Sequence, residues 1–217
     1  MDSPKVRVVK IVRILEKAYP SPHTLLAFET PLQILIATIL SAQCTDERVN
    51  KLTPALFKKY PTARAFAEAD RAALELDVRP TGFFRNKAKS IIGAARKIVD
   101  DFGGRVPDTM AELVTLPGVA RKTANCVLGT WFRKNEGIVV DTHVGRLAER
   151  LGLTTTARDS KDAERIERDL IPLFPQDTWT WLAHALMQHG RTVCTARKPK
   201  CDQCPLAADC PSAGKIG

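Results

Sequence analysis

The stretch Leu116-Pro117-Gly118-Val119-Ala120-Arg121-Lys122 joins two predicted helices through a tight Pro-Gly turn. The first helix is short, with Asp108 as its expected N-cap and its end near residue 114, and the second runs from about residue 119 to residue 132. Unpaired N–H groups at the start of a helix, together with the helix dipole, form an anion site. A plain helix–helix connection is the alternative, but the basic character of the chain favours a phosphate.

Outward from this turn, apolar residues recur at helical spacing along nearly the whole chain. The Thr30-Pro31 pair marks a helix start, and Gly103-Gly104 marks a helix end. The last helix is expected between Asp177 as cap and Gly190 as stop. The only β-like run, at 138–140, is too short to found a sheet, so we predict an all-α fold. The predicted helices are 4–18, 31–40, 46–59, 63–69, 71–76, 86–102, 142–150, 160–170 and 178–189.

The composition of the chain limits the kinds of molecule that it is expected to bind. The chain has 217 residues, 44% of them hydrophobic, and Lys plus Arg exceed Asp plus Glu by 33 to 24. The net charge of +9 favours a polyanionic partner, although a generic basic protein would share it. The longest apolar run, Leu32 to Leu40, is too short for a membrane span, and the N-terminus has no apolar run of signal-peptide length. We therefore expect a cytoplasmic protein.

Four cysteines close the chain with the spacing C-x6-C-x2-C-x5-C. Three readings compete: disulfides, which suit secreted proteins; a four-thiolate zinc site, which usually has two C-x2-C pairs; and an iron–sulfur cluster, which accepts varied spacings. The two other cysteines, Cys44 and Cys126, are expected to be buried packing thiols. The candidate metal ligands are Cys194, Cys201, Cys204 and Cys210.

Two residues are candidates for chemistry. Lys122 lies in the first turn of a helix, where the dipole disfavours a cation, and partial burial would lower its pKa further and make it a nucleophile. A solvated surface lysine is the simpler alternative. Asp141 precedes Thr142-His143-Val144 as a predicted N-cap, and it could also place a carboxylate near the lysine. For the nearby His143, we expect a role in orienting its loop and not in the chemistry.

Four motifs follow one another along the chain: Ser41-Ala42-Gln43-Cys44-Thr45-Asp46, the hairpin with Lys122, the aspartate in Val-Asp-Thr-His-Val, and the four spaced cysteines. In this order they resemble endonuclease III, a family of bifunctional DNA glycosylases with a helix-hairpin-helix. The resemblance covers about residues 8–211. It implies a six-helix barrel domain at 22–135 and an iron–sulfur cluster domain made of 1–21 and 136–217. It also implies a four-iron, four-sulfur cluster on the four cysteines.

The resemblance further implies the activity. Such an enzyme acts as a monomer on duplex DNA containing oxidised pyrimidines or abasic sites, at the nucleoid if the source is prokaryotic. Lys122 displaces the damaged base and forms a Schiff base, and Asp141 assists before β-elimination cuts the strand. Gln43 fills the gap left by the extruded base, and Phe83 is an apolar wedge, although adjacent Phe84 is an alternative. Phosphate contacts are expected at Leu116, Pro117, Gly118, Val119, Ala120, Arg197, Lys198 and Lys200.

The sequence also departs from the family pattern. Ala120 replaces the second glycine usual in the hairpin, and Phe83 stands where an aliphatic wedge is common. A related adenine glycosylase shares the cysteines but lacks a lysine at this hairpin position and continues into a further domain. A cluster-bearing DNA-binding protein without activity is the other alternative, and the pair Lys122 and Asp141 argues against it.

Overall fold

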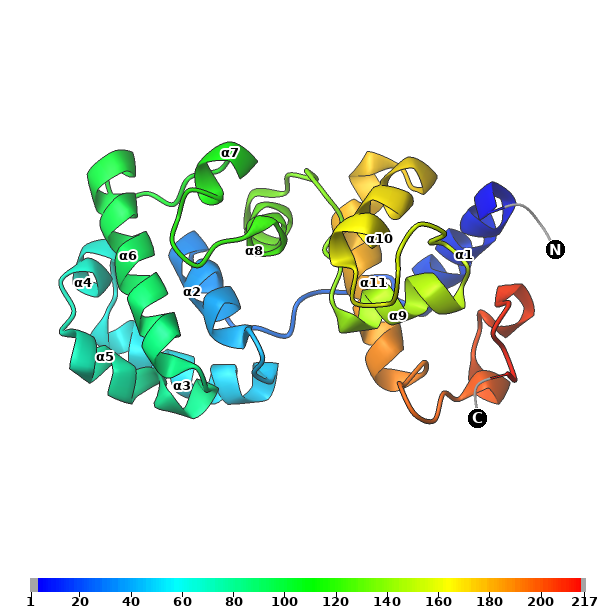
Figure 1. Cartoon of the computed structure of the whole chain (residues 1–217), viewed down its shortest axis with the longest axis horizontal. Coiled ribbons are helices and arrows are strands. Elements are labelled where there is room, and N and C mark those ends of the chain that lie inside the picture. Colours follow the sequence, from blue (N-terminus) through cyan, green and yellow to red (C-terminus); the bar gives the residue numbers. More distant parts are fainter. Residues whose placement is uncertain (1–3, 216–217) are drawn as a thin grey trace. The chain divides into compact units, whose positions relative to one another are not determined.

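The structure is a computed structural model that describes residues 4–215, and within that range every regular element is a helix. The chain divides into two compact units, Leu25–Lys134 and a second unit made of Met1–Thr24 with Asn135–Gly217 (Figure 1). Residues 1–3 and 216–217 of the expected cluster domain lie outside the described residues. Among residues 4–215, no helix combines the length and apolar character that crossing a membrane requires.

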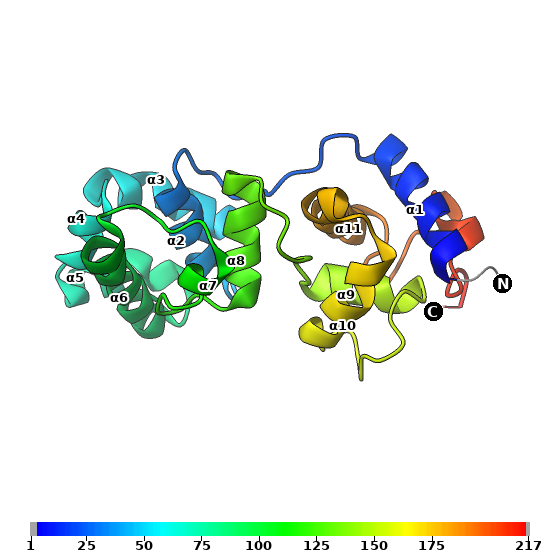
Figure 2. The same ribbon diagram turned by 90° about the horizontal axis from the view of Figure 1, so that it is seen from above.

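The unit Leu25–Lys134 is built around α2 (Pro31–Ser41), which packs against α3, α6 and α8 (Figure 2). Its almost uniformly apolar sequence is explained by this central place, because Ile34, Leu35 and Ile36 are fully buried. The other helices of the unit are α3 (Asp46–Lys59), α4 (Ala63–Ala67), α5 (Arg71–Val78), α6 (Phe84–Phe102), α7 (Met110–Leu113) and α8 (Arg121–Val127), which continues into a π-helical turn at Leu128–Phe132.

Side-chain caps start most of these helices where the sequence predicts. Thr30 caps α2 by accepting a hydrogen bond from the Gln33 amide, and Thr45 caps α3 in the same way. The predicted bounds of α3 are confirmed residue for residue. Gly103, in the left-handed conformation, ends α6 as predicted. Local chemistry is therefore enough to fix these ends.

Two predicted boundaries around the hairpin are wrong. The cap of α7 is Thr109, whose hydroxyl accepts from the Glu112 amide, whereas Asp108 accepts a hydrogen bond from the Lys134 ammonium. The following helix begins at Arg121 and not near residue 119, because Ala120 is still extended, with φ −88° and ψ 170°. The turn is therefore longer than its Pro-Gly core.

The second unit holds α1 (Pro4–Ala18), α9 (Thr142–Arg150), α10 (Ala163–Leu170) and α11 (Trp179–Thr192). The apolar face of α1 confirms the predicted amphipathic pattern, since Val8, Ile11 and Leu15 are buried. Ile138 and Val140 are also buried but form no strand, and they pack in the same core as α1. The chain after α11 returns to lie against α1 through a short turn at Ala207–Asp209 (Figure 2).

The predicted ends of α11 are wrong at both sides. Thr178 takes the N-cap position in place of Asp177, and the helix continues past Gly190 to Thr192. A Cβ at position 190 would lie 2.8 Å from the Cβ of His143. Gly190 is therefore explained by the close approach of α9, and not by a helix stop.

Candidate active site and cluster loop

The hairpin turn packs on α6. Gly118 has φ +78°, and a Cβ there would lie 2.5 Å from the Cβ of Ser90, so only glycine meets both conditions. Leu116 and Val119 are buried and anchor the turn, and the Val119 amide closes it on the Leu116 carbonyl at 3.1 Å. Pro117 is exposed. The turn is therefore held rigidly while part of it faces solvent.

Ala120 occupies an ordinary extended conformation and is exposed. This geometry suits an L-residue, so the backbone of the hairpin does not require a second glycine. Ala120 also makes no side-chain capping bond at the start of α8.

Lys122 is the second residue of α8 and is exposed. Of the two alternatives left open by the sequence, its environment is that of a surface lysine. An exposed amine next to a rigid turn is free to attack a bound molecule. Cys126 lies one helical turn further on. Burial raises the pKa of its thiol, and a hydrogen bond with Thr38 and the charge of Lys122 act in the opposite direction. Cys44 and Cys126 are only partly buried packing thiols and not fully buried ones.

Asp141 is the N-cap of α9, as predicted. One carboxylate oxygen accepts from the amides of His143 and Val144, each at 2.8 Å. The second oxygen is not needed for the cap, and the side chain is only half-buried. The carboxylate can therefore cap the helix and still meet a ligand. His143 contacts Arg146, with 3.1 Å between Nδ1 and Nη2, and burial lowers the pKa of its ring.

Gln43 and Phe83 share an unusual backbone. They adopt the left-handed conformation, with φ of 53° and 47°, and both side chains are exposed. Non-glycine residues rarely hold this conformation, and it concentrates at functional sites. Of the described residues, only Arg133 joins them as a non-glycine with positive φ.

The structure separates the two neighbouring phenylalanines. Phe83 is 62% exposed, whereas Phe84 packs against the core of its unit. Phe83 is therefore the ring that is free to meet another molecule. The sequence could not decide this, because the direction of each ring depends on the turn before α6.

The four C-terminal cysteines line one pocket together with Arg150 and Pro199. All six cysteines of the chain are free thiols. Burial raises the pKa of Cys204 and Cys210, and the neighbouring cysteines raise it further. Four thiols this close resist ionisation unless a cation compensates them, so the donor set and its pocket fit a thiolate-ligated metal cluster.

Two arginines of α9 hold this loop, and sequence reasoning missed both. Arg150 donates to the Cys194 Sγ at 3.2 Å and to the carbonyls of Thr195 and Ala196, each at 2.8 Å. Arg146 donates to the carbonyls of Gly190 and Cys194. The two arginines are four residues apart on one face of α9, a spacing that could have revealed them.

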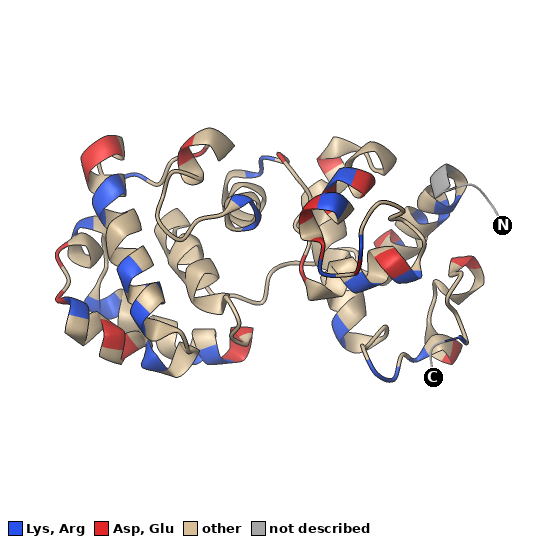
Figure 3. Ribbon diagram, viewed as in Figure 1, with Lys and Arg blue, Asp and Glu red and all other residues tan. Residues whose placement is uncertain are grey.

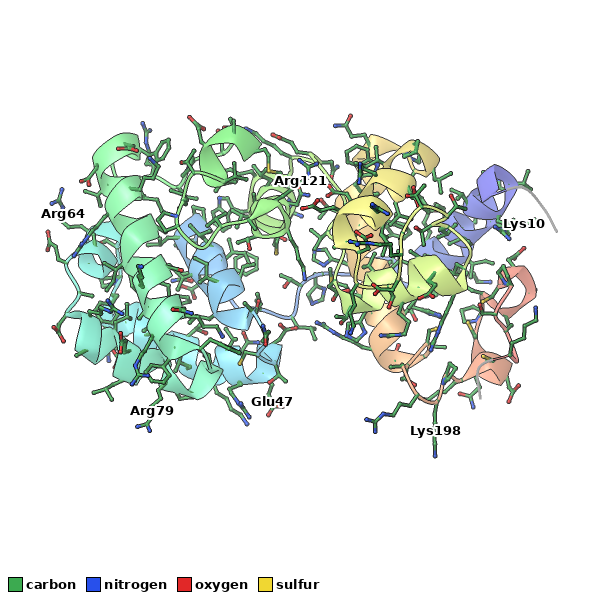
Figure 4. All side chains as sticks on the ribbon, in the orientation of Figure 1. Lys10, Glu47, Arg64, Arg79, Arg121 and Lys198 are labelled. Atoms are coloured by element: carbon green, nitrogen blue, oxygen red, sulfur yellow. The ribbon has the colours of Figure 1, made fainter. Side chains whose placement is uncertain are left out.

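The loop itself turns basic side chains outward. Arg197, Lys198 and Lys200 are exposed, and Figure 4 shows Lys198 directed away from the ribbon. Figure 3 shows a second group of basic residues along α6, whose sequence contains Arg85, Lys89, Arg96 and Lys97. Arg85, Lys89 and Arg96 are exposed, so each unit carries exposed basic side chains.

The fold and the cysteine loop match two family models. One, described as HhH-GPD superfamily base excision DNA repair protein, matches residues 36–175, and the other, the iron-sulfur binding domain of endonuclease III, matches residues 194–210. The helical fold with its hairpin therefore places the chain in the class of base excision DNA repair proteins.

Known proteins narrow the class further. The chain is 57% identical to endonuclease III of Synechocystis sp. over 98% of its own length and 95% of that protein. It also matches the structure of a non-covalent endonuclease III–DNA complex with a TM-score of 0.91 and 37% identity, covering 99% of this chain and 98% of the other. A trapped endonuclease III–DNA covalent intermediate matches with the same TM-score and identity, over 99% of both chains. The chain belongs to the endonuclease III family.

Proposed function

We propose that this chain is a bifunctional DNA glycosylase and abasic-site lyase, which removes oxidised pyrimidines from duplex DNA and then cuts the strand. One observation carries the proposal: an exposed lysine, Lys122, stands in the first turn of the helix that follows a rigid hairpin. The relative trapped as a covalent endonuclease III–DNA intermediate supports a bond between enzyme and DNA during the reaction.

The chemistry follows from the amine. The neutral Nζ of Lys122 attacks C1′ of the damaged nucleotide, and the base leaves with the electron pair of the glycosidic bond and takes up a proton. The sugar ring opens, and the lysine holds C1′ as a Schiff base. This positive charge acidifies C2′, so loss of a C2′ proton expels the 3′ phosphate by β-elimination. Water then releases the lysine.

Asp141 has the right chemistry to support this sequence. Its carboxylate, half-buried as the cap of α9, would stabilise positive charge on the sugar and assist proton transfer. The helix cap fixes its orientation, so the group needs no reorganisation as charge develops.

The damaged nucleotide must leave the duplex to reach the lysine. Gln43 then fills the space, because its amide both donates to and accepts from the unpaired opposite base. Phe83 inserts as the wedge that keeps the kinked strand open. Exposure and a fixed left-handed backbone at both residues support these roles.

Phosphates would bind at two places. The hairpin residues 116–120 would form one anion site, and the exposed Arg197, Lys198 and Lys200 would form the other. The cofactor is a four-iron, four-sulfur cluster, held by the cysteines that line the loop pocket. Its part is to shape the basic loop. The enzyme would act as a monomer in the cytoplasm, at the nucleoid.

Borohydride trapping tests the proposal. The wild-type protein should become covalently linked to duplexes containing thymine glycol or an abasic site, and Lys122→Gln should bind the same duplexes but give no trapped product. The matched control is Lys51→Gln, an exposed lysine that pairs with Glu47 on α3. Trapping that persists in Lys122→Gln would assign the nucleophile to another residue, and a wild-type protein that traps neither duplex would overturn the proposed function.

A further inference from the structure

Lys87 is a buried lysine in the first turn of α6. The residue is 5% exposed, although the chain has many surface lysines that remain in solvent. Burying an ammonium group is costly unless its hydrogen bonds are satisfied. A lysine kept in such a place therefore needs a structural or functional reason.

The partners of Lys87 are two carbonyl oxygens from distant parts of the chain. Its Nζ donates to the carbonyl of Leu40 and to the carbonyl of Thr81, each at 2.8 Å. Leu40 lies in the last turn of α2, where carbonyls lack partners within the helix and the dipole favours a cation. Thr81 ends the short 3-10 turn that precedes α6.

Each carbonyl lies a few residues before an exposed residue whose backbone is in the left-handed conformation. Gln43 follows Leu40 by three residues, and Phe83 follows Thr81 by two. The amide of Lys87 also donates to the Phe83 carbonyl at 3.0 Å, so this lysine holds the Phe83 turn through its main chain as well as its side chain. One residue thereby fixes the starting points of both loops.

We propose that Lys87 is a positioning residue whose ammonium group sets the spacing between the Gln43 loop and the Phe83 loop, so that both side chains enter the DNA together. This inference rests on the proposed function for the roles of Gln43 and Phe83. The link itself is a property of the unit Leu25–Lys134 and needs no DNA.

The electrostatics agree with a fixed link. Burial lowers the pKa of Lys87, and the nearby Cys44 works in the opposite direction. Cys44 lies next to Gln43, and its amide donates to the Ser41 carbonyl at 3.0 Å to close the same turn. A methionine at position 87 would fill the same space with apolar atoms but leave both carbonyls without their donor.

The test compares Lys87→Met with two controls at the other end of α6, Ile98→Val and Ile98→Ala. Ile98 is fully buried and lies about three helical turns beyond Lys87 along α6. The two Ile98 variants therefore give a smaller and a larger general loss of stability, between which the loss in Lys87→Met can be placed. Thermal unfolding identifies the control that matches Lys87→Met. Hydrogen exchange of residues 41–44 and 82–84 then reports on the loops without DNA.

We expect amide exchange in both segments to be about tenfold faster in Lys87→Met than in the matched control, as the loss of hydrogen bonds to a charged group implies. Excision of thymine glycol should also fall about tenfold, with a smaller loss on an abasic duplex, where no base has to be extruded. If amide exchange in Lys87→Met equals that in the matched control, or is faster in one loop only, Lys87 does not link the two loops. Faster exchange in both loops with equal losses on the two substrates would overturn its positioning role.

The wild-type protein on the same duplexes separates this inference from the proposed function. Wild-type protein that cleaves neither duplex would refute the function, whereas the exchange measurement would still judge the link made by Lys87. Active wild-type protein with a Lys87→Met variant indistinguishable from the matched control would refute the inference alone.

Discussion

Arg150 donates a hydrogen bond from its guanidinium to the sulfur of Cys194, at 3.2 Å. The same side chain binds the next two carbonyls of the loop, so one residue of α9 fixes three successive residues at the start of the cluster segment. Hydrogen bonds to a thiolate stabilise its negative charge, and the planar guanidinium suits several acceptors at once. The start of the cysteine loop is therefore held by α9 through the side chain of Arg150.

Arg150→Lys should loosen this segment without removing a ligand. Lysine keeps the charge but cannot reach three acceptors in the same geometry, so a chelator should remove iron about tenfold faster than from wild type. The decay of the broad absorption near ~400 nm measures this rate. Arg165→Lys, on the exposed side of α10, is the control. An unchanged rate in Arg150→Lys would show that iron retention does not depend on the hydrogen bonds of Arg150.

Asp141→Asn should separate the cap from the chemistry. Asparagine caps helices nearly as well as aspartate, so the melting temperature should change little, whereas turnover should fall by about 10²-fold or more if the carboxylate moves protons. Asp70→Asn is a matched control, because Asp70 caps α5 through a 2.8 Å bond from the Ala73 amide. Near wild-type turnover in Asp141→Asn would limit Asp141 to the cap.

Alanine substitutions at Phe83 and Phe84 should have opposite effects: the first should slow excision, and the second should lower stability. Phe83→Ala removes an exposed ring, so the free energy of unfolding should change by less than about 0.5 kcal/mol, while excision of a base lesion should slow about tenfold. Phe84→Ala removes a packed ring and should cost about 2 kcal/mol, roughly half the loss at a fully buried phenylalanine. Chemical denaturation and single-turnover kinetics measure both. Unchanged excision by Phe83→Ala would contradict the wedge.

Binding should depend on salt through the cluster loop. Replacing Arg197, Lys198 and Lys200 with alanine should reduce the slope of log affinity against log salt by about one unit for each phosphate that the variant no longer binds. The control replaces Arg64 and Arg71, which form exposed i,i+4 ion pairs in the other unit. Titrations of one duplex at several salt concentrations measure the slope. An unchanged slope in the triple variant would place the DNA-binding surface elsewhere.

Gln43→Ala should slow the excision of thymine glycol more than the cleavage of an abasic duplex. Without the amide, the unpaired opposite base has no partner, so thymine glycol excision should slow about tenfold, about the loss expected for one or two hydrogen bonds. Cleavage of an abasic duplex should slow less, since no base is extruded. Gln43→Asn keeps the amide and tolerates the left-handed backbone, so it should retain more activity. Equal losses on both duplexes would rule out gap filling.

Much of this protein could be predicted from local sequence. The Thr30-Pro31 pair predicts the start of α2, because a cap satisfies amides within three residues of itself, as Thr30 does. The bounds of α3 were also predicted, and its cap, Thr45, acts in the same way. The all-α fold, the cysteine loop and the cap at Asp141 were predictable for the same reason. Each depends on residue types at short spacing, which the sequence contains in full.

Tertiary structure decided what depends on distant neighbours. In the sequence Gly190 suggests a helix stop, but in the structure it allows the close approach of α9. The sequence also does not distinguish Phe83 from Phe84, whereas in the structure only Phe84 packs against the core. Lys87 resembles any other basic residue of the sequence, yet its ammonium binds a carbonyl 47 residues away. The sequence by itself determined the helices and the reactive groups, because those follow from local hydrogen bonding. Only packing decided which side chains are exposed to act and which are buried to hold them in place.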